Sequence, residues 1–184
     1  MAILLNPVES KPDLRHARGL ALHARTVALL SARVCECLGL GERETRVIER
    51  AALLHDIGKL AIPAEILDKP CALDEDEWAV VRRHPVFGEA VVGALAHDPQ
   101  VRSLVRHHHE RWDGAGYPDA LTGDAIPLGA RVIAACDTFD AITSPRPYRR
   151  ARGVTPALAE ICAVAGTQLD PDVAAALVLT LSAA

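Results

Sequence analysis

The stretch "PLGARVIAACDTFDAITS", residues 127–144, combines a strongly apolar run with an internal acidic residue. After its opening Pro-Leu-Gly, the run is apolar on nearly every side, which is typical of a long helix buried in a protein core. Asp137 nevertheless falls in the middle of it. Because a buried, unpaired carboxylate is strongly unfavourable, this aspartate is expected to be paired or to bind a metal ion. The segment therefore predicts a buried helix that carries a polar site.

Further helices are predicted on both sides of this segment. Residues 14–38 carry leucine and valine at helical spacing, and residues 42–54 end in the wholly apolar "AALL", so the second helix is expected to be central. Asp74 and Glu77 have the spacing of a capping box ahead of "WAVVRRH". Three more helix starts are predicted where a capping side chain precedes a proline, at Asp98-Pro99, Thr155-Pro156 and Asp170-Pro171. The sequence shows no convincing alternating strand and no repeat, so the expected fold is a compact all-α bundle, irregular at 58–73, 112–126 and 144–154.

Length and composition narrow the class of protein. The 184 residues fit one domain, expected at 13–184 behind a leader at 1–12. Half of the residues are apolar but only 3% are aromatic, so the core must consist of alanine, leucine, valine and isoleucine. The net charge of -4 argues against binding to a nucleic-acid polymer but allows a local basic pocket.

The location of the protein is inferred from its cysteines and its apolar runs. The five cysteines form no CxxC pair and are expected to be reduced thiols in a cytoplasmic protein. No signal peptide and no apolar run of about 18 residues is visible, so no membrane span is expected.

Histidines and aspartates recur where the predicted helices end. His55 and Asp56 follow directly after "AALL", His23 lies on the first helix, and His84 is expected to end the "WAVVRRH" helix. His108 and His109 are expected to end the next helix. Nitrogen and oxygen donors without thiolates suit iron or manganese before structural zinc. These five histidines, together with Asp56 and Asp137, offer more ligands than the four of one tetrahedral site. This number indicates two metal ions bridged by a carboxylate.

Some neighbouring residues leave alternatives open. His16 lies seven residues before His23 and faces the same way on a helix, although the "HARTVA" that begins at His23 favours His23 as the ligand. His107 is interpreted as a neighbour of the ligands rather than as a ligand. Glu110 could orient a ligand imidazole or remain a solvated charge.

The chain resembles the HD-GYP domains, a branch of the HD superfamily of metal-dependent phosphohydrolases. The likeness extends over residues 16–181. It rests on the motifs "HDIGK" (55–59), "RRHP" (82–85), "HHERWDGAGYP" (108–118), "RVIAACDTFDAIT" (131–143), "RPYR" (146–149) and "GTQLDPDV" (166–173). The resemblance implies an HD-superfamily helical bundle with a glycine-rich GYP loop.

The resemblance also implies a function and a set of site residues. Family members hydrolyse cyclic di-GMP to linear pGpG, and some continue to GMP, by attack of a hydroxide that bridges two divalent ions, iron or manganese. The implied metal ligands are His23, His55, Asp56, His84, His108, His109 and Asp137, with Asp56 as the bridging carboxylate. Lys59 would neutralise charge near the metals, contact the substrate and take part in catalysis, and Asp140 would assist in catalysis. Tyr117, Arg146 and Arg149 would contact the substrate, the two arginines through its phosphates.

One departure from the family pattern bears on the number of metal ions. Some members hold a third ion with a glutamate four residues before the first histidine ligand, and Gly19 stands at that position. The expected number of ions is therefore two. The family also implies contact with GGDEF-type synthases through residues 112–118.

Two other functions remain open at the level of sequence. The chain could be a regulatory module that binds a cyclic dinucleotide or a partner with little turnover, or it could hydrolyse another cyclic dinucleotide. Degenerate relatives typically lose histidines or the tyrosine, and neither is lost here, which favours an enzyme. The sequence does not identify the residues that contact the bases.

Overall fold

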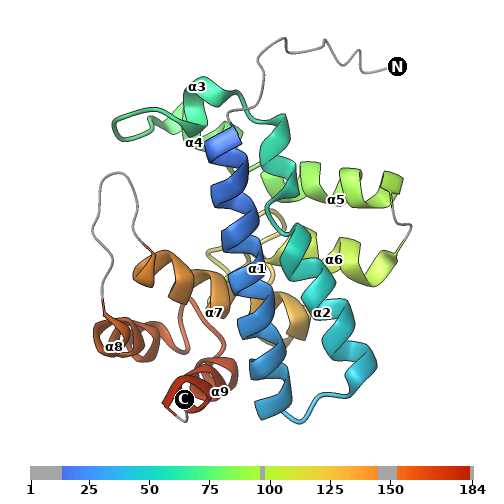
Figure 1. The fold of residues 1–184 in the computed structure, drawn as a ribbon, viewed down its shortest axis with the longest axis vertical. Coiled ribbons are helices and arrows are strands. Elements are labelled where there is room, and N and C mark those ends of the chain that lie inside the picture. Colours follow the sequence, from blue (N-terminus) through green and yellow to red (C-terminus); the bar gives the residue numbers. More distant parts are fainter. Residues whose placement is uncertain (1–13, 96–97, 145–152, 183–184) are drawn as a thin grey trace.

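The computed structural model describes residues 14–95, 98–144 and 153–182, with side chains from residue 20 onward within these ranges. Figure 1 shows a bundle in which α1 runs lengthwise and α2 returns beside it. The helices of the described ranges are α1 (Leu14–Cys37), α2 (Glu42–Leu54), α3 (Ala64–Leu67), α4 (Glu75–Val81), α5 (His84–Leu95), α6 (Pro99–His107), α7 (Leu128–Thr143), α8 (Val154–Val164) and α9 (Pro171–Ser182), with the 3-10 helices η1 (Ile57–Ala61) and η2 (Gly123–Ala125). The expected leader and the two "RPYR" arginines, Arg146 and Arg149, lie outside these ranges.

The predicted all-α fold is confirmed. Within the described ranges, β-type pairing is limited to one isolated bridge between Ala165 and Leu169. No helix in the part of the chain that the structure describes is both long enough and apolar enough to cross a bilayer.

The core forms around α7, where the sequence predicts a buried helix. Val132 and Ile133 of α7 are fully buried, as are Val27 of α1 and Ala51 of α2. Burying a side chain of the valine or isoleucine type contributes about 1.5–3 kcal/mol, so this core holds the three helices together. Asp140, also on α7, is buried among these apolar residues.

The predicted helix caps agree with the structure at three of four positions. Asp74 and Glu77 form both hydrogen bonds of a capping box, at 2.9 Å each. Asp98 accepts hydrogen bonds from the N–H groups that open α6, and Asp170 does the same for α9. The prediction at Thr155 is wrong, because the N-cap of α8 is Gly153, two residues earlier, and the helix begins at Val154.

Two other local predictions are wrong. His84 does not end the "WAVVRRH" helix but begins α5, because α4 ends at Val81 and Pro85 suits the first turn of a new helix, where no N–H is needed. Two of the segments expected to be irregular contain helical turns, since residues 58–73 include most of η1 and all of α3, and residues 112–126 include η2.

Gly58 allows η1 to lie directly against the start of α5. A Cβ atom at this position would lie 1.9 Å from the backbone oxygen of His84 and 2.5 Å from the backbone nitrogen of Gly88. Only glycine permits so close an approach of two backbones. Because His55 and Asp56 immediately precede this turn, the contact brings them to the side of His84.

We expect Gly58→Ala to destabilise the protein by about 1–3 kcal/mol, since the added methyl must push η1 away from α5. Thermal and urea unfolding measure this change. Gly41→Ser is the control, because a Cβ at Gly41 meets nothing within 4 Å and serine remains a good N-cap for α2. Equal stability of the two variants would contradict the role assigned to Gly58.

Candidate metal centre

The seven predicted ligand residues converge on one place although they come from separate parts of the chain. His23 comes from α1, Asp137 from α7, and His84 from the first position of α5. The remaining four, His55, Asp56, His108 and His109, directly follow the ends of α2 and α6. The Nε2 atom of His55 lies 3.3 Å from that of His23, and the Nε2 atom of His84 lies 3.3 Å from that of His108.

Three of the imidazoles are oriented by the carbonyl groups of the helices that precede them. The Nδ1 atoms of His55, His84 and His108 donate to backbone oxygens three residues earlier, at 2.7, 2.8 and 2.7 Å. These oxygens lie in last turns of helices, where carbonyl groups have no partner within the helix. Each bond fixes the tautomer, so the bare Nε2 atom faces the centre, as metal binding requires.

Asp56 lies between two groups of possible ligands. In each group, one ligand atom from every residue lies within 4.8 Å of all the others. The two groups are His23, His55 and Asp56, and Asp56, His84, His108 and His109. Asp137 lies beside the first group, with Oδ1 3.2 Å from Nε2 of His23.

The contacts of the Asp56 carboxylate fit metal ions on both of its sides. Oδ1 lies 3.3 Å from Nε2 of His84, and Oδ2 lies 3.5 Å from Nε2 of His55 and 2.6 Å from Nζ of Lys59. Oδ1 is buried and has no hydrogen-bond partner in the described structure. A buried acceptor without a partner is unfavourable, and a cation beside it would remove that penalty.

Burial and neighbouring charges keep several of these groups in the form that binds metal. Burial lowers the pKa of His84, and it lowers the pKa of His109 to about 3. Burial would raise the pKa of Asp56, but the electrostatic influence of the neighbouring His55 and Lys59 outweighs it and holds that pKa well below the ordinary value. Neutral imidazoles and an ionised carboxylate result, and these are the species that coordinate divalent ions.

His23 differs because two aspartates hold it from both sides. Its Nδ1 donates to Asp140 at 2.6 Å, and the Asp140 carboxylate also accepts from the Ser144 hydroxyl at 3.1 Å. Burial opposes a charge on His23, but the hydrogen bonds to Asp137 and Asp140 outweigh it and raise the pKa of His23 to about 9. The structure therefore places Asp140 behind His23, where it orients the ring, and not among the groups that share Asp56.

Metal uptake at pH 7 should release about one proton from His23, since only the neutral imidazole binds a metal ion. The release should fall as the pH rises through about 9, where free His23 has already lost this proton. Calorimetry in two buffers of different ionisation enthalpy measures the number of protons. Asp140→Asn is the comparison variant, because it removes one charge that holds the proton and should lower the release at pH 7. If both proteins released the same number of protons, and this number did not change between pH 7 and pH 9.5, the interpretation would be wrong.

The GYP loop, residues 112–118, contacts the group of Asp56, His84, His108 and His109 through the Tyr117 side chain. The ring of Tyr117 stacks on that of His109, with centroids 5.0 Å apart and planes inclined by 27°. Gly116 lets the loop backbone pack against that of Glu110 and Arg111, since a Cβ there would lie 2.3 Å from the backbone nitrogen of Arg111. Tyr117, which the sequence predicts to contact the substrate, thus lies beside His109 at the edge of the candidate metal centre. Lys59 lies at the same centre, beside Asp56.

Charged residues that the sequence left without a firm role hold this loop. The Glu110 carboxylate is buried and accepts from the backbone N–H groups of Asp119 at 2.7 Å and Leu121 at 3.1 Å. Arg106 donates two hydrogen bonds of 2.7 Å to the Asp119 carboxylate, and His107 donates a third at 2.9 Å. Glu110 is thus neither a partner of a ligand imidazole nor a solvated charge, and His107 holds the loop beside the ligands.

Glu110→Gln should destabilise the protein by about 1–2 kcal/mol, because an amide can accept only one of these two backbone hydrogen bonds without turning its own donors toward the other. Metal content should not change, since every candidate ligand remains. Urea unfolding and metal analysis measure the two effects. Glu36→Gln, at an exposed position of α1, is the control. A stability unchanged in Glu110→Gln would show that the carboxylate does not fix the loop.

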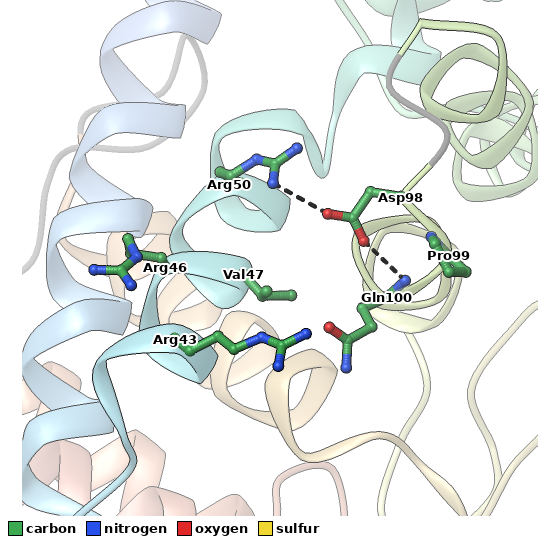
Figure 2. A pocket seen from close by; sticks show the side chains of 7 residues that line it. All are labelled: Arg43, Arg46, Val47, Arg50, Asp98, Pro99 and Gln100. Carbon is green, nitrogen blue, oxygen red and sulfur yellow. Dashed lines mark hydrogen bonds and ion pairs between the residues drawn. The ribbon is translucent and has the colours of Figure 1, made fainter.

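A separate hollow of about 540 Å³ lies between α2 and α6 (Figure 2). Arg43, Arg46 and Arg50 line it from α2, and Asp98 bonds to Arg50 at 3.1 Å across it. None of the residues that line the hollow is among the seven predicted ligands. This hollow is therefore not part of the metal centre.

Comparison with known proteins gives the family. The model of the HD domain family matches residues 11–173. The cyclic di-GMP phosphodiesterase response regulator RpfG of Xanthomonas campestris is 51% identical over 140 residues, which cover 75% of this chain and 37% of that protein. The 3'3'-cGAMP-specific phosphodiesterase 3 of Vibrio cholerae is 39% identical over 155 residues, which cover 84% of this chain and 34% of that protein.

A solved structure agrees at the level of the fold. Bd1817, a HDG"Y"P protein from Bdellovibrio bacteriovorus, superposes with a TM-score of 0.73 at 21% identity, over 89% of this chain and 52% of that one.

The chain belongs to the HD domain family, as the match of the family model over residues 11–173 shows. The resemblance to HD-GYP members is confirmed, and the chain spans about a third of the length of the two curated relatives described above.

Proposed function

We propose that this chain is a metal-dependent phosphodiesterase that hydrolyses cyclic dinucleotides, with cyclic di-GMP as its substrate. The observation that carries the proposal is the position of Asp56, whose buried and partly unpartnered carboxylate lies between two groups of imidazoles. The names of the related proteins support the reaction and its class of substrate.

Two divalent ions, iron or manganese, would fit the donors present. His23, His55, Asp56 and Asp137 would hold one, and Asp56, His84, His108 and His109 the other. Nitrogen and oxygen donors without thiolates suit these metals. When bound, such a pair supplies Lewis acidity toward a phosphodiester oxygen and lowers the pKa of water.

The chain's own residues would prepare the site for an anionic substrate. Lys59 offers a cationic group beside Asp56, and Asp140 keeps His23 in one orientation. Tyr117 would contact the substrate at the edge of the site. Arg146 and Arg149 lie outside the described residues, and we propose that their guanidinium groups hold the phosphates.

The finer features of the proposal follow the resemblance to HD-GYP domains. The product would be linear pGpG, with further hydrolysis to GMP in some members, and residues 112–118 would be the contact for a GGDEF-type synthase. Hydrolysis of 3'3'-cGAMP is the second candidate activity, because a relative that is 39% identical carries that name.

The Asp56→Asn variant tests the proposal, since the amide loses the charge that both ligand groups share. We expect metal content to fall from about two ions per chain to less than one and hydrolysis of cyclic di-GMP to fall by at least about a thousandfold. Metal analysis and chromatography of the products measure both. Asp76→Asn, at an exposed position in α4, is the control.

Three outcomes would contradict parts of the proposal. Tight binding of cyclic di-GMP by the metal-loaded protein without linear product would support a regulatory module in place of an enzyme. Three tightly bound ions per chain, in protein purified without chelators, would contradict the two-metal site. An Asp56→Asn variant that retains both ions would show that this carboxylate does not bridge them.

A further inference from the structure

A line of flat side chains leads from the metal centre to the surface at the end of α4. Beyond Tyr117, which stacks on His109, the guanidinium carbon of Arg82 lies 6.0 Å from the centroid of the Tyr117 ring. The same atom lies 6.0 Å from the centroid of the Trp78 ring. Trp78 and Arg82 are four residues apart, so they lie on one face of the helix end. Arg82 therefore lies between the two aromatic rings.

Neither Trp78 nor Arg82 is buried in the core of the protein. The protein has two tryptophans. Trp112 is half-buried beneath Arg131, whereas Trp78 is 47% exposed. Arg131 is paired with carboxylates, but within the described ranges no carboxylate lies within ion-pair distance of the exposed guanidinium of Arg82. A half-exposed indole therefore lies next to a guanidinium group that has no carboxylate partner among the described residues.

These two groups have the chemistry that recognises a guanine base. Stacking of a base on an aromatic ring contributes about 1–3 kcal/mol and suits every base. A guanidinium group donates two parallel hydrogen bonds to the O6 and N7 atoms of guanine. Adenine has an amino group where guanine has O6, and arginine cannot accept a hydrogen bond from it.

We propose that Trp78 and Arg82 form a subsite for one guanine of a cyclic dinucleotide. This inference rests on the proposed function, in which a phosphodiester lies at the metal centre and the bases extend beyond it. The base stacks on the Trp78 indole, and Arg82 donates to its O6 and N7 edge. Arg82 thereby favours guanine over adenine at this position.

Kinetics with two kinds of diester test the subsite. Bis(p-nitrophenyl) phosphate offers a phosphodiester without bases, so it reports on the metal centre alone. For Trp78→Ala, we expect the ratio of kcat/KM for cyclic di-GMP to that for the model diester to fall roughly tenfold, mainly through KM, with recovery in Trp78→Phe. For Arg82→Lys, the preference for cyclic di-GMP over cyclic di-AMP should fall roughly tenfold, because lysine offers a single point charge.

Arg83→Ala is the matched control, since the guanidinium of Arg83 lies over Phe87, 5.1 Å from its centroid, and not over Tyr117. This variant should keep both ratios. Equal losses on the cyclic dinucleotide and on the model diester would show that Trp78 acts through the fold, and unchanged ratios in all variants would also overturn the subsite.

Tryptophan fluorescence gives a readout that does not depend on turnover rates. Trp112→Phe leaves Trp78 as the sole tryptophan. On rapid mixing with cyclic di-GMP, the stacked guanine should quench the emission of Trp78. Cyclic di-AMP should quench this emission less strongly. Absence of quenching in a protein that hydrolyses cyclic di-GMP would overturn the subsite. A protein that hydrolyses neither diester would contradict the proposed function, and the quenching would still decide whether guanine stacks on Trp78.

Discussion

The candidate metal centre is built around a buried carboxylate, that of Asp56, which imidazoles surround. Burial alone would drive Asp56 toward its protonated form, but the electrostatic influence of the neighbouring His55 and Lys59 holds its pKa well below the ordinary value. One of its oxygens is buried and has no hydrogen-bond partner in the described structure. Such an arrangement is unfavourable in a protein that only needs to fold. Cations between Asp56 and the surrounding imidazoles would remove the penalty, which connects the stability of the fold to its chemistry.

The bundle prepares this centre through the ends of its helices. Carbonyl groups in last turns lack partners within their helices, and here they accept from the Nδ1 atoms of His55, His84 and His108. The same hydrogen bonds satisfy the helix ends and direct three Nε2 atoms inward. Gly58 then lets η1 touch α5, which brings Asp56 beside His84. The fold and the geometry of the site therefore have a common origin.

Much of this organisation can be predicted from the sequence, but not all of it. The apolar run around Asp137 indicates both the buried helix and its polar site, and the motifs identify the residues that the structure brings together. The break before His84 escaped prediction, because "WAVVRRHP" reads as one helix unless Pro85 is taken as the start of another. The role of Glu110 depends on backbone N–H groups nine and eleven residues later, which no local pattern reveals. Trp78 is a single exposed aromatic residue, and its position beside Arg82 and Tyr117 emerges only in three dimensions.

Anomalous scattering from crystals of the protein loaded with manganese or iron tests the central claim most directly. The account predicts two peaks about 3.5–4 Å apart on either side of the Asp56 carboxylate, one near His55 and the other near His84. A single peak, or peaks that the Asp56 carboxylate does not contact, would contradict it.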